Sequence, residues 1–224
     1  MDDPVALIVG AGPGISGAFG EALVAAGYKV ALASRNLNKL APLAKAMGAM
    51  PFEVDVSSAP SVVRLFENVD RALGPSDVVL FNPSARIRGE LLSLDMEAAA
   101  AAIQISAIGG LVTAQEAARR MLPRGRGSIF FTGATASVKG FPRSSVFSMG
   151  KFALRGLAQS LARELGPAGI HVVHFIIDGA VAQGNNDLES FSPRAIARSY
   201  MAALSQTRGA WTSEIELRSN VEPF

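Results

Sequence analysis

The sequence predicts an α/β fold: one doubly wound parallel sheet of about seven strands, with helices on both faces. Short apolar segments alternate with segments of helical periodicity along almost the whole chain, and this alternation is typical of parallel sheets. The chain has 224 residues, enough for one buried core but too few for two ordinary domains, so residues 1–224 are expected to form a single domain. The first apolar segment also runs directly into a glycine-rich turn.

Each predicted strand is a short apolar run, and each predicted helix fills the gap that follows. We expect strands at residues 5–9, 29–33, 49–54, 77–81, 128–132, 170–177 and 214–217. We expect helices at residues 15–26, 37–47, 61–73, 95–121, 145–165 and 193–205. Glycine or proline stands where these helices should stop, as at Gly27 and Gly74-Pro75.

Composition excludes several classes of function. The net charge is only +2, and the basic residues are scattered, so no nucleic-acid partner is expected. No apolar run approaches the length needed to cross a bilayer, so no membrane partner is expected either. The chain lacks cysteine, and we expect no metal site. No export signal is visible at the N-terminus, which favours the cytoplasm.

The strongest local signal is the turn after the first strand. Residues 12–17 match G-x-G-x-x-G between a strand and a helix, the context that a dinucleotide-binding turn requires. Glycines let the backbone approach a pyrophosphate, and the N–H groups of the helix start favour its charge. Tight packing alone is the alternative explanation. The predicted contacts are Gly10, Gly12, Pro13, Gly14 and Ile15.

The ends of later strands suggest the rest of a nucleotide site. After the second strand, Ser34, Arg35 and Asn36 stand where an NAD-binding protein usually carries a carboxylate. A guanidinium there would bind a 2′-phosphate, so NADP(H) is favoured over NAD(H), and a solvated arginine is the alternative. Two further strand ends could contact the cofactor, although the last could equally be turn chemistry: Asp55-Val56 and Asn82-Pro83-Ser84.

Together these segments resemble the short-chain dehydrogenase/reductase family over essentially the whole chain, which implies a Rossmann-like fold. The family's pyrophosphate loop resembles residues 10–16, with Ser16 in place of its last glycine. Its Asp-Val adenine contact resembles Asp55-Val56, and its Asn-Ala-Gly strand end resembles Asn82-Pro83-Ser84. Its Tyr-x-x-x-Lys active-site helix resembles residues 147–151. Gly179 begins the segment after the sixth strand, and we expect it to contact the cofactor; residues 179–192 are expected to form a short mobile loop over the substrate side.

The resemblance breaks at the catalytic residues. Phe147 stands in the place of the family's tyrosine, Ala134 in that of its serine and Ser106 in that of its asparagine, whereas Lys151 is retained. The tyrosine hydroxyl that the resemblance implies as proton donor is therefore missing. Lys151 lies four residues after Phe147 on the same helix face, where its ammonium could bind the ribose hydroxyls of the cofactor.

Three functions remain open at this point. The first is an NADP(H)-dependent oxidoreductase that transfers a hydride to or from a small carbonyl compound, imine or enone, with Lys151, Phe147 and Ser106 at its catalytic centre. The second is an inactive nucleotide-binding or partner subunit, and the third is a scaffold. The helices at 95–121 and 145–165 are apolar over wide arcs. Family members commonly pair these two helices, so the resemblance implies a homodimer or homotetramer.

Overall fold

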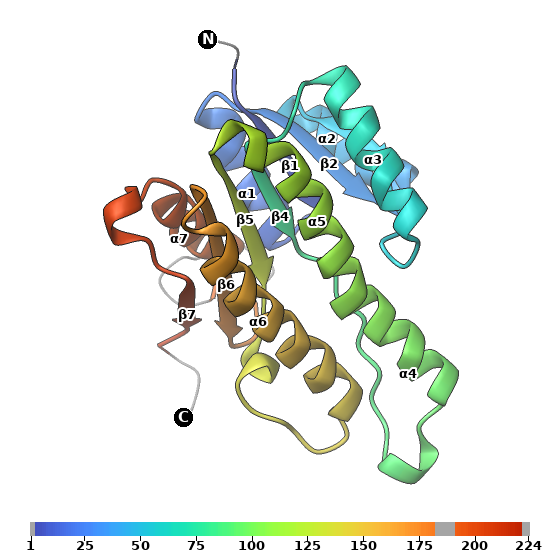
Figure 1. The fold of residues 1–224 in the computed structure, drawn as a ribbon. Helices are drawn as coiled ribbons and strands as arrows, with labels where there is room; N and C mark the ends of the chain where they lie inside the picture. The colour runs from blue at the N-terminus through green and yellow to red at the C-terminus, as the bar shows by residue number, and fades with distance from the viewer. Residues whose placement is uncertain (1–2, 182–190, 221–224) are drawn as a thin grey trace.

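The computed structural model describes residues 3–181 and 191–220 (Figure 1). Most of the loop expected at residues 179–192 lies outside them. Seven parallel strands form one sheet in the order β3-β2-β1-β4-β5-β6-β7, which confirms the predicted fold class. The strands are β1 (Val5–Val9), β2 (Lys29–Ser34), β3 (Met50–Glu53), β4 (Val78–Phe81), β5 (Gly127–Thr132), β6 (Ile170–Asp178) and β7 (Glu214–Arg218). The strand order reverses between β1 and β4, the place where open α/β sheets bind ligands.

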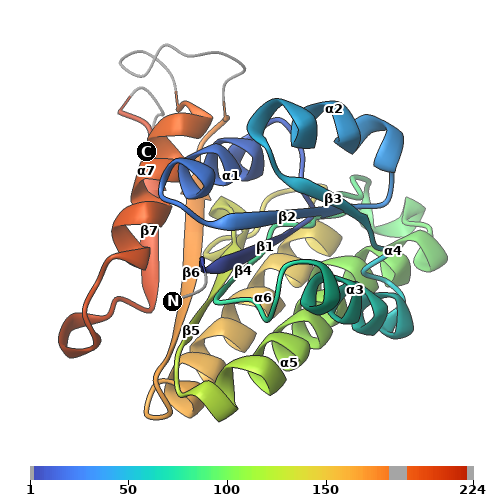
Figure 2. The same ribbon diagram turned by 90° about the horizontal axis from the view of Figure 1, so that it is seen from above.

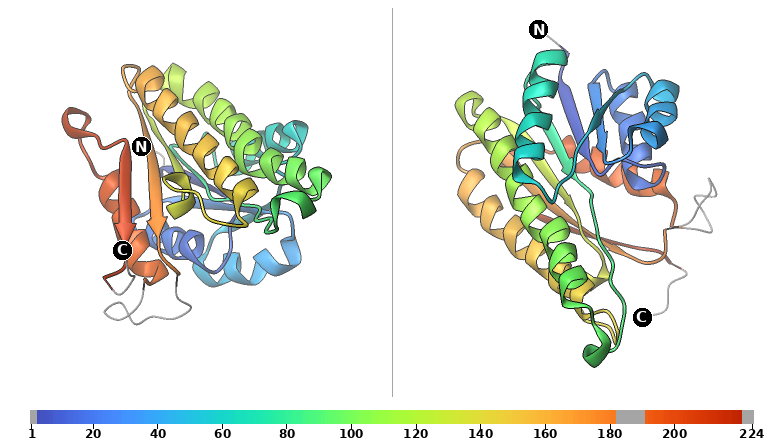
Figure 3. Two further views of the ribbon diagram at one scale, coloured as in Figure 1. Left: turned by 90° about the horizontal axis from the view of Figure 1, so that it is seen from below. Right: turned by 90° about the vertical axis from the view of Figure 1, so that its right-hand side faces the viewer.

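Helices cover both faces of the sheet (Figure 2). One face carries α1 (Ile15–Ala25), α2 (Leu37–Met47) and α7 (Pro193–Leu204). The other carries α3 (Ala59–Ala72), α5 (Gly109–Met121) and α6 (Ser145–Leu165). The start of α6 and α4 (Met96–Ile103) extend side by side past the end of the sheet (Figure 3), where Ala99, Ala102 and Val146 form a small separate core.

The central strands are apolar throughout because both of their faces are buried. In β1, Leu7 and Val9 pack toward α3, α5 and α6, whereas Ala6 and Ile8 pack toward α1 and α7. Side chains of a strand alternate between faces, so a strand covered on both sides has no polar positions. This burial explains why the strands read as unbroken apolar runs in the sequence.

Capping decides where several elements begin. Helix α3 starts at Ala59, two residues before the expected position, because the Ser58 hydroxyl accepts a hydrogen bond from the Ser61 N–H. The helix expected at residues 95–121 is divided into α4, a π-helical turn at Gln104–Ile108 and α5, with Asp95 as its N-cap. Apolar periodicity runs through the π turn, so no feature of the sequence predicts it.

The helical segment from Met96 to Arg124 corrects the expectation about apolar length. It spans 29 residues and contains an 18-residue window with a mean hydropathy of 1.4, of which 33% is buried. By length and composition alone it could cross a membrane, although the core helix of a soluble protein passes the same test. In this fold, Ala114, Ala117 and Met121 of α5 pack into the core under the sheet.

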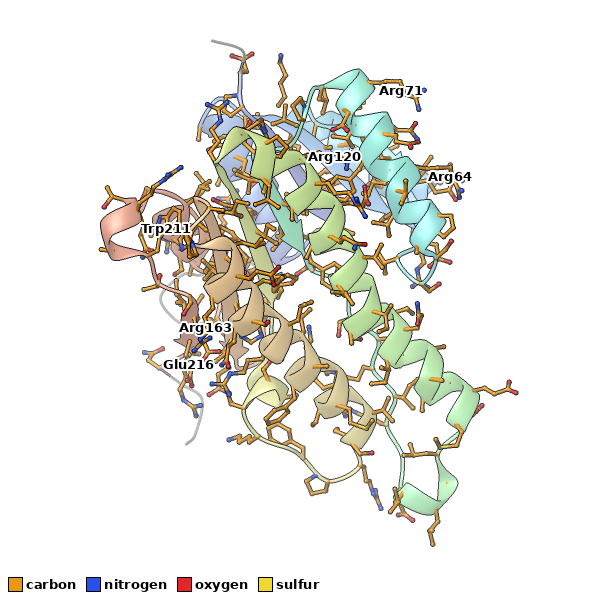
Figure 4. All side chains as sticks on the ribbon, viewed as in Figure 1. Arg64, Arg71, Arg120, Arg163, Trp211 and Glu216 are labelled. Atoms are coloured by element: carbon orange, nitrogen blue, oxygen red, sulfur yellow. The ribbon has the colours of Figure 1, made fainter. Side chains whose placement is uncertain are left out.

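Arginines at the end of α5 are paired with acidic residues. The Arg120 guanidinium lies 2.6 Å from Asp70 of α3 and 2.9 Å from Glu116, and only 15% of its side chain is exposed. Arg124 lies 2.8 Å from Asp77. Figure 4 shows Arg120 between α5 and α3, whereas Arg64 and Arg71 of α3 extend outward. The Arg120–Asp70 pair therefore joins α5 to α3, and the Arg124–Asp77 pair joins the turn after α5 to the residue before β4.

Candidate active site

The ends of β1 and β4 are held close together at the switch point. Gly10 follows β1 with a φ of +78°, and a Cβ on it would lie 2.7 Å from Pro83. The Asn82 amide group donates a hydrogen bond to the Gly10 carbonyl oxygen at 3.0 Å. A side chain at position 10 would therefore meet both steric and backbone strain. The backbones at the ends of β1 and β4 are therefore closely packed here, at Gly10, Asn82 and Pro83.

The turn between β1 and α1 is open where its glycines meet solvent. A Cβ on Gly12 or Gly14 would have no neighbour within 4 Å, and Gly14 gives α1 no side-chain cap. The Ser16 hydroxyl instead accepts a hydrogen bond from the Gly12 N–H at 3.0 Å, which holds the turn in place. The uncapped N–H groups at the start of α1 suit a negatively charged group. This turn therefore fits a pyrophosphate, and the serine at position 16 is part of its structure.

Two adjoining cavities extend from the turn. The first, of about 670 Å³, is lined by Ala11, Gly12, Pro13, Ser34, Arg35, Asn36, Lys39, Leu40 and Leu43. The second, of about 520 Å³, is lined by Gly10, Ala11, Ser34, Arg35, Val54, Asp55, Val56, Asn82, Pro83, Ser84, Ala85 and Ile105. Ala11, Ser34 and Arg35 line both cavities, so the two form one crevice across the strand ends. It joins eleven of the fifteen predicted cofactor contacts, and the four that do not line it are Gly14, Ile15, Lys151 and Gly179.

Arg35 is the exposed cation at the junction of these cavities. Lys39 lies four residues further on and lines the first cavity with it. Sequence reasoning missed Lys39, which lies in the first turn of α2, whereas Arg35 precedes the N-cap of that helix. The Asn36 side chain accepts a hydrogen bond from the Lys39 N–H at 3.0 Å, so it caps α2. Two cations thus stand where a 2′-phosphate would lie.

Asp55 lines the second cavity in its ionised form. The Ser57 hydroxyl donates to a carboxylate oxygen of Asp55 at 2.7 Å, and the Ser57 N–H donates to the same oxygen at 3.0 Å. These hydrogen bonds, assisted by the positive charge of Arg35, lower the pKa of Asp55 below its usual value. The carboxylate is therefore charged at neutral pH and available as an acceptor.

Helix α6 places Phe147 and Lys151 one turn apart. The Lys151 Nζ donates to the Thr132 carbonyl oxygen at 2.7 Å, and its side chain is buried. Burial, with the charge of Arg86 as a second cause, lowers the pKa of Lys151 to about 8. Phe147 is also buried, and the Arg86 guanidinium lies 4.4 Å from the centre of its ring. The Arg86 guanidinium therefore lies over the ring of Phe147, one helical turn before Lys151.

Ser106 connects three parts of the site from the π-helical turn. Its hydroxyl accepts a hydrogen bond from the Ala85 N–H at 3.2 Å, just before Arg86. A Cβ on Gly150 of α6 would lie 2.9 Å from the Ser106 Cβ, so the π turn and α6 are in close contact. Such turns are frequent at functional sites. Ser106 is buried and fixes the chain that leaves β4.

A third cavity, of about 740 Å³, lies beside Phe147. It is lined by Arg86, Arg88, Gly89, Ala134, Thr135, Ala136, Phe141, Pro142, Arg143, Ser144, Phe147, Ile177 and Gly179. Ala134 and Gly179 are thus brought to the same place as Phe147. Sequence reasoning missed the three arginines; the only signal was that Arg86 and Arg88 follow a predicted strand end at alternate positions.

Some polar residues are kept away from these cavities. The Tyr200 hydroxyl shares a hydrogen bond of 3.0 Å with Thr132 inside the core, and burial raises the pKa of Tyr200. His174 is fully buried, and burial lowers its pKa to about 4. Ile15 packs against the core around α1 and lines none of the three cavities. Only its N–H group can contribute to the turn.

Comparisons with known proteins agree with this geometry. A crystal structure of a short-chain dehydrogenase from Rhodopseudomonas palustris is 34% identical, with a TM-score of 0.85, and the match covers 96% of this chain and 98% of that one. A metagenomic short-chain oxidoreductase solved in complex with NADP shares the fold, with a TM-score of 0.88 at 22% identity over 99% of both chains.

Sequence comparison leads to the same family. An uncharacterised oxidoreductase of Staphylococcus aureus is 28% identical over 229 residues, which cover 97% of this chain and 98% of that protein. The family profile described as short chain dehydrogenase matches residues 4–188. This match takes in the glycine turn, the crevice and the Phe147–Lys151 turn, and the chain therefore belongs to the short-chain dehydrogenase family, whose members bind nicotinamide dinucleotides.

Proposed function

We propose that this protein is an NADP(H)-dependent oxidoreductase that transfers a hydride to or from a small carbonyl compound, imine or enone. The observation that carries the proposal is one crevice lined by the glycine turn before the uncapped start of α1 and by Arg35. Lys151 on α6 is buried and lines none of the three cavities, and its amine is held by the Thr132 carbonyl oxygen. An anion-binding turn, a cation and a buried amine suit the pyrophosphate, the 2′-phosphate and the ribose hydroxyls of one dinucleotide.

Each part of the cofactor has residues that would hold it. The N–H groups of Gly14 and Ile15 would bind the pyrophosphate, and Arg35 with Lys39 the 2′-phosphate. Asp55 and Val56 would face the adenine, and Asn82 to Ser84 the ribose nearest the sheet. NADP(H), when bound, supplies or accepts the hydride. Lys151, anchored on the Thr132 carbonyl, keeps donors free for the ribose hydroxyls.

The proton is the unusual part of the chemistry. Phe147 would replace the tyrosine of the family and cannot donate a proton, and loss of a positioned general acid costs about 10²- to 10⁴-fold in rate. A substrate that already carries positive charge, such as an iminium, needs no proton at the hydride step. Ser106 holds the backbone at Ala85, so its role here is to position residues. These features favour imines or other activated acceptors over simple ketones.

A second candidate is an inactive nucleotide-binding subunit. The observation in its favour is the same phenylalanine, which leaves the cavity beside Phe147 without a phenol hydroxyl from α6. Such a subunit would bind NADP(H) with the same residues and would not turn over.

Hydride transfer to a panel of imines, enones and ketones separates the two candidates. NADPH oxidation is followed for wild type and for Phe147→Tyr, with Phe141→Tyr as a control that adds a hydroxyl elsewhere on the same cavity. We expect wild type to reduce an imine or enone and Phe147→Tyr to give no increase on that substrate. A silent wild type, together with ketone reduction gained in Phe147→Tyr alone, would establish the inactive subunit.

We also propose that the protein assembles as a homodimer or homotetramer through α5 and α6. Apolar side chains on this side are exposed: Ile108 by 40%, Leu111 by 47%, Met149 by 61% and Phe152 by 44%. An exposed apolar surface of this kind marks an interaction site. Light scattering should give at least twice the monomer mass, and a monomer would contradict this assembly.

A further inference from the structure

The cavity beside Phe147 has an unusual charge. Three arginines line it and no carboxylate does. Arg143 is paired with Glu90 at 2.6 Å. Within residues 3–181 and 191–220, the side chains of Arg86 and Arg88 have no ion pair or hydrogen bond, and the ring of Phe147 is the contact of Arg86. The cavity therefore presents two guanidinium groups whose donors have no acceptor in the part of the chain that the structure describes.

The segment that carries these arginines is fixed at both ends. Ser106 accepts a hydrogen bond from the Ala85 N–H, and the Gly89 N–H donates to the Arg143 carbonyl oxygen at 3.1 Å. Arg143 has a φ of +59°, a conformation that a non-glycine residue keeps only where its surroundings enforce it. Arg86 and Arg88 are exposed, and both line the same cavity. The backbone that carries the two guanidinium groups is thus held at the cavity in advance of any ligand.

The other lining residues limit the size and nature of the ligand. Phe141, Pro142 and Ile177 add apolar surface, and Thr135 and Ser144 add two hydroxyl groups. This combination suits a small organic molecule with an apolar body and one charged end. A guanidinium matches a carboxylate with two parallel hydrogen bonds, which a lysine cannot do.

We propose that the substrate carries a carboxylate, which Arg86 binds over the ring of Phe147 with Arg88 beside it. This inference rests on the proposed function and specifies its substrate class. A guanidinium keeps its proton at neutral pH, so Arg86 binds and orients the substrate and does not replace the missing acid. The bound carboxylate also offsets the positive charge of Arg86 close to Lys151, which favours the protonated amine at the site.

Matched pairs of ligands test the proposal by binding. Linear oxo acids from pyruvate to 5-oxohexanoate, and the primary amide of each, are titrated by calorimetry into the protein with and without saturating NADPH. We expect at least one acid to bind about tenfold or more tightly than its amide, since hydrogen bonds to charged groups contribute about that factor. Equal binding of acid and amide throughout the series, or binding of neither, would overturn the proposal.

Variants test whether Arg86 causes the tighter binding of acids than of their amides. Arg86→Ala should remove most of the tenfold or greater advantage of the acid, and Arg86→Lys should restore only part of it. Arg64→Ala on the outer side of α3 is the control and should bind acids as wild type does. Unchanged NADPH affinity shows that Arg86→Ala is folded; if that variant does not fold, the comparison of acid with amide on wild type decides. An acid preference that survives Arg86→Ala contradicts the proposal, whereas failure to bind NADPH with the acid preference intact contradicts only the proposed function.

Discussion

Replacement of Lys151 by methionine tests whether the buried amine titrates near neutrality. Methionine has similar length and no charge, so it removes the titration with little loss of volume. In the folded protein the pKa of Lys151 is about 8, against 10.5 for an ordinary lysine, because the amine is buried and Arg86 lies nearby. Between these values the unfolded chain binds more protons than the folded one.

The linkage between proton binding and folding fixes the sign and size of the effect. Stability rises with pH wherever the unfolded state binds more protons, so Lys151 makes the folded protein more stable from pH 8 toward pH 10.5. Each pKa unit corresponds to about 1.4 kcal/mol. From about pH 7.5 to about pH 9.5, the unfolding free energy of wild type should gain about 2 kcal/mol from this residue. Lys151→Met should lack this gain.

Urea unfolding at the two pH values measures the difference, since ionisations common to both proteins cancel. Lys45→Met, which removes an exposed lysine on α2, is the control and should keep the pH dependence of wild type. If Lys151→Met and wild type show the same change of unfolding free energy with pH, then Lys151 is not desolvated as described and the account of the site is wrong.

Three other changes have defined outcomes. Gly10→Ala should lower the unfolding free energy by about 1–3 kcal/mol in urea, because φ is +78° and its Cβ would meet Pro83. Gly12→Ala should retain wild-type stability but weaken NADPH binding in a fluorescence titration, because its Cβ enters open space at the turn; unchanged binding would argue against a pyrophosphate there. Wild type should lose stability in urea as the pH falls from about 6.5 toward about 4, because His174 takes up a proton in the unfolded chain while its buried imidazole stays neutral in the folded one, and His174→Asn should lose less over that range.

The fold was largely predictable because its signals are local. Buried parallel strands such as β1 are apolar at every position, and the glycine turn stands between a strand and a helix. Ends of elements were less predictable because they depend on single hydrogen bonds, such as the cap by Ser58 that starts α3. The π-helical turn around Ser106 was invisible because it interrupts no apolar pattern.

The site was predictable only where a single residue at the end of a strand lines the cofactor crevice. Gly12, Arg35 and Asp55 each follow a strand, and a parallel sheet brings such ends together. Arg86 was missed because its position at the cavity depends on residues far away in the sequence. Helix α6 supplies Phe147, which the Arg86 guanidinium contacts, and Ser106 binds the backbone of the preceding residue, Ala85. Charges that act across distant segments leave no spacing pattern in the sequence.

Calorimetric titration of wild type and Arg35→Ala with NADPH and NADH tests the central claim most directly, with Arg64→Ala as the control. The account predicts that wild type binds NADPH about tenfold or more tightly than NADH, because a hydrogen-bonded charge pair contributes about 1.5–3 kcal/mol. Arg35→Ala should lose most of this preference while it still binds NADH. Equal binding of the two nucleotides by wild type, or no binding of either, would contradict the account.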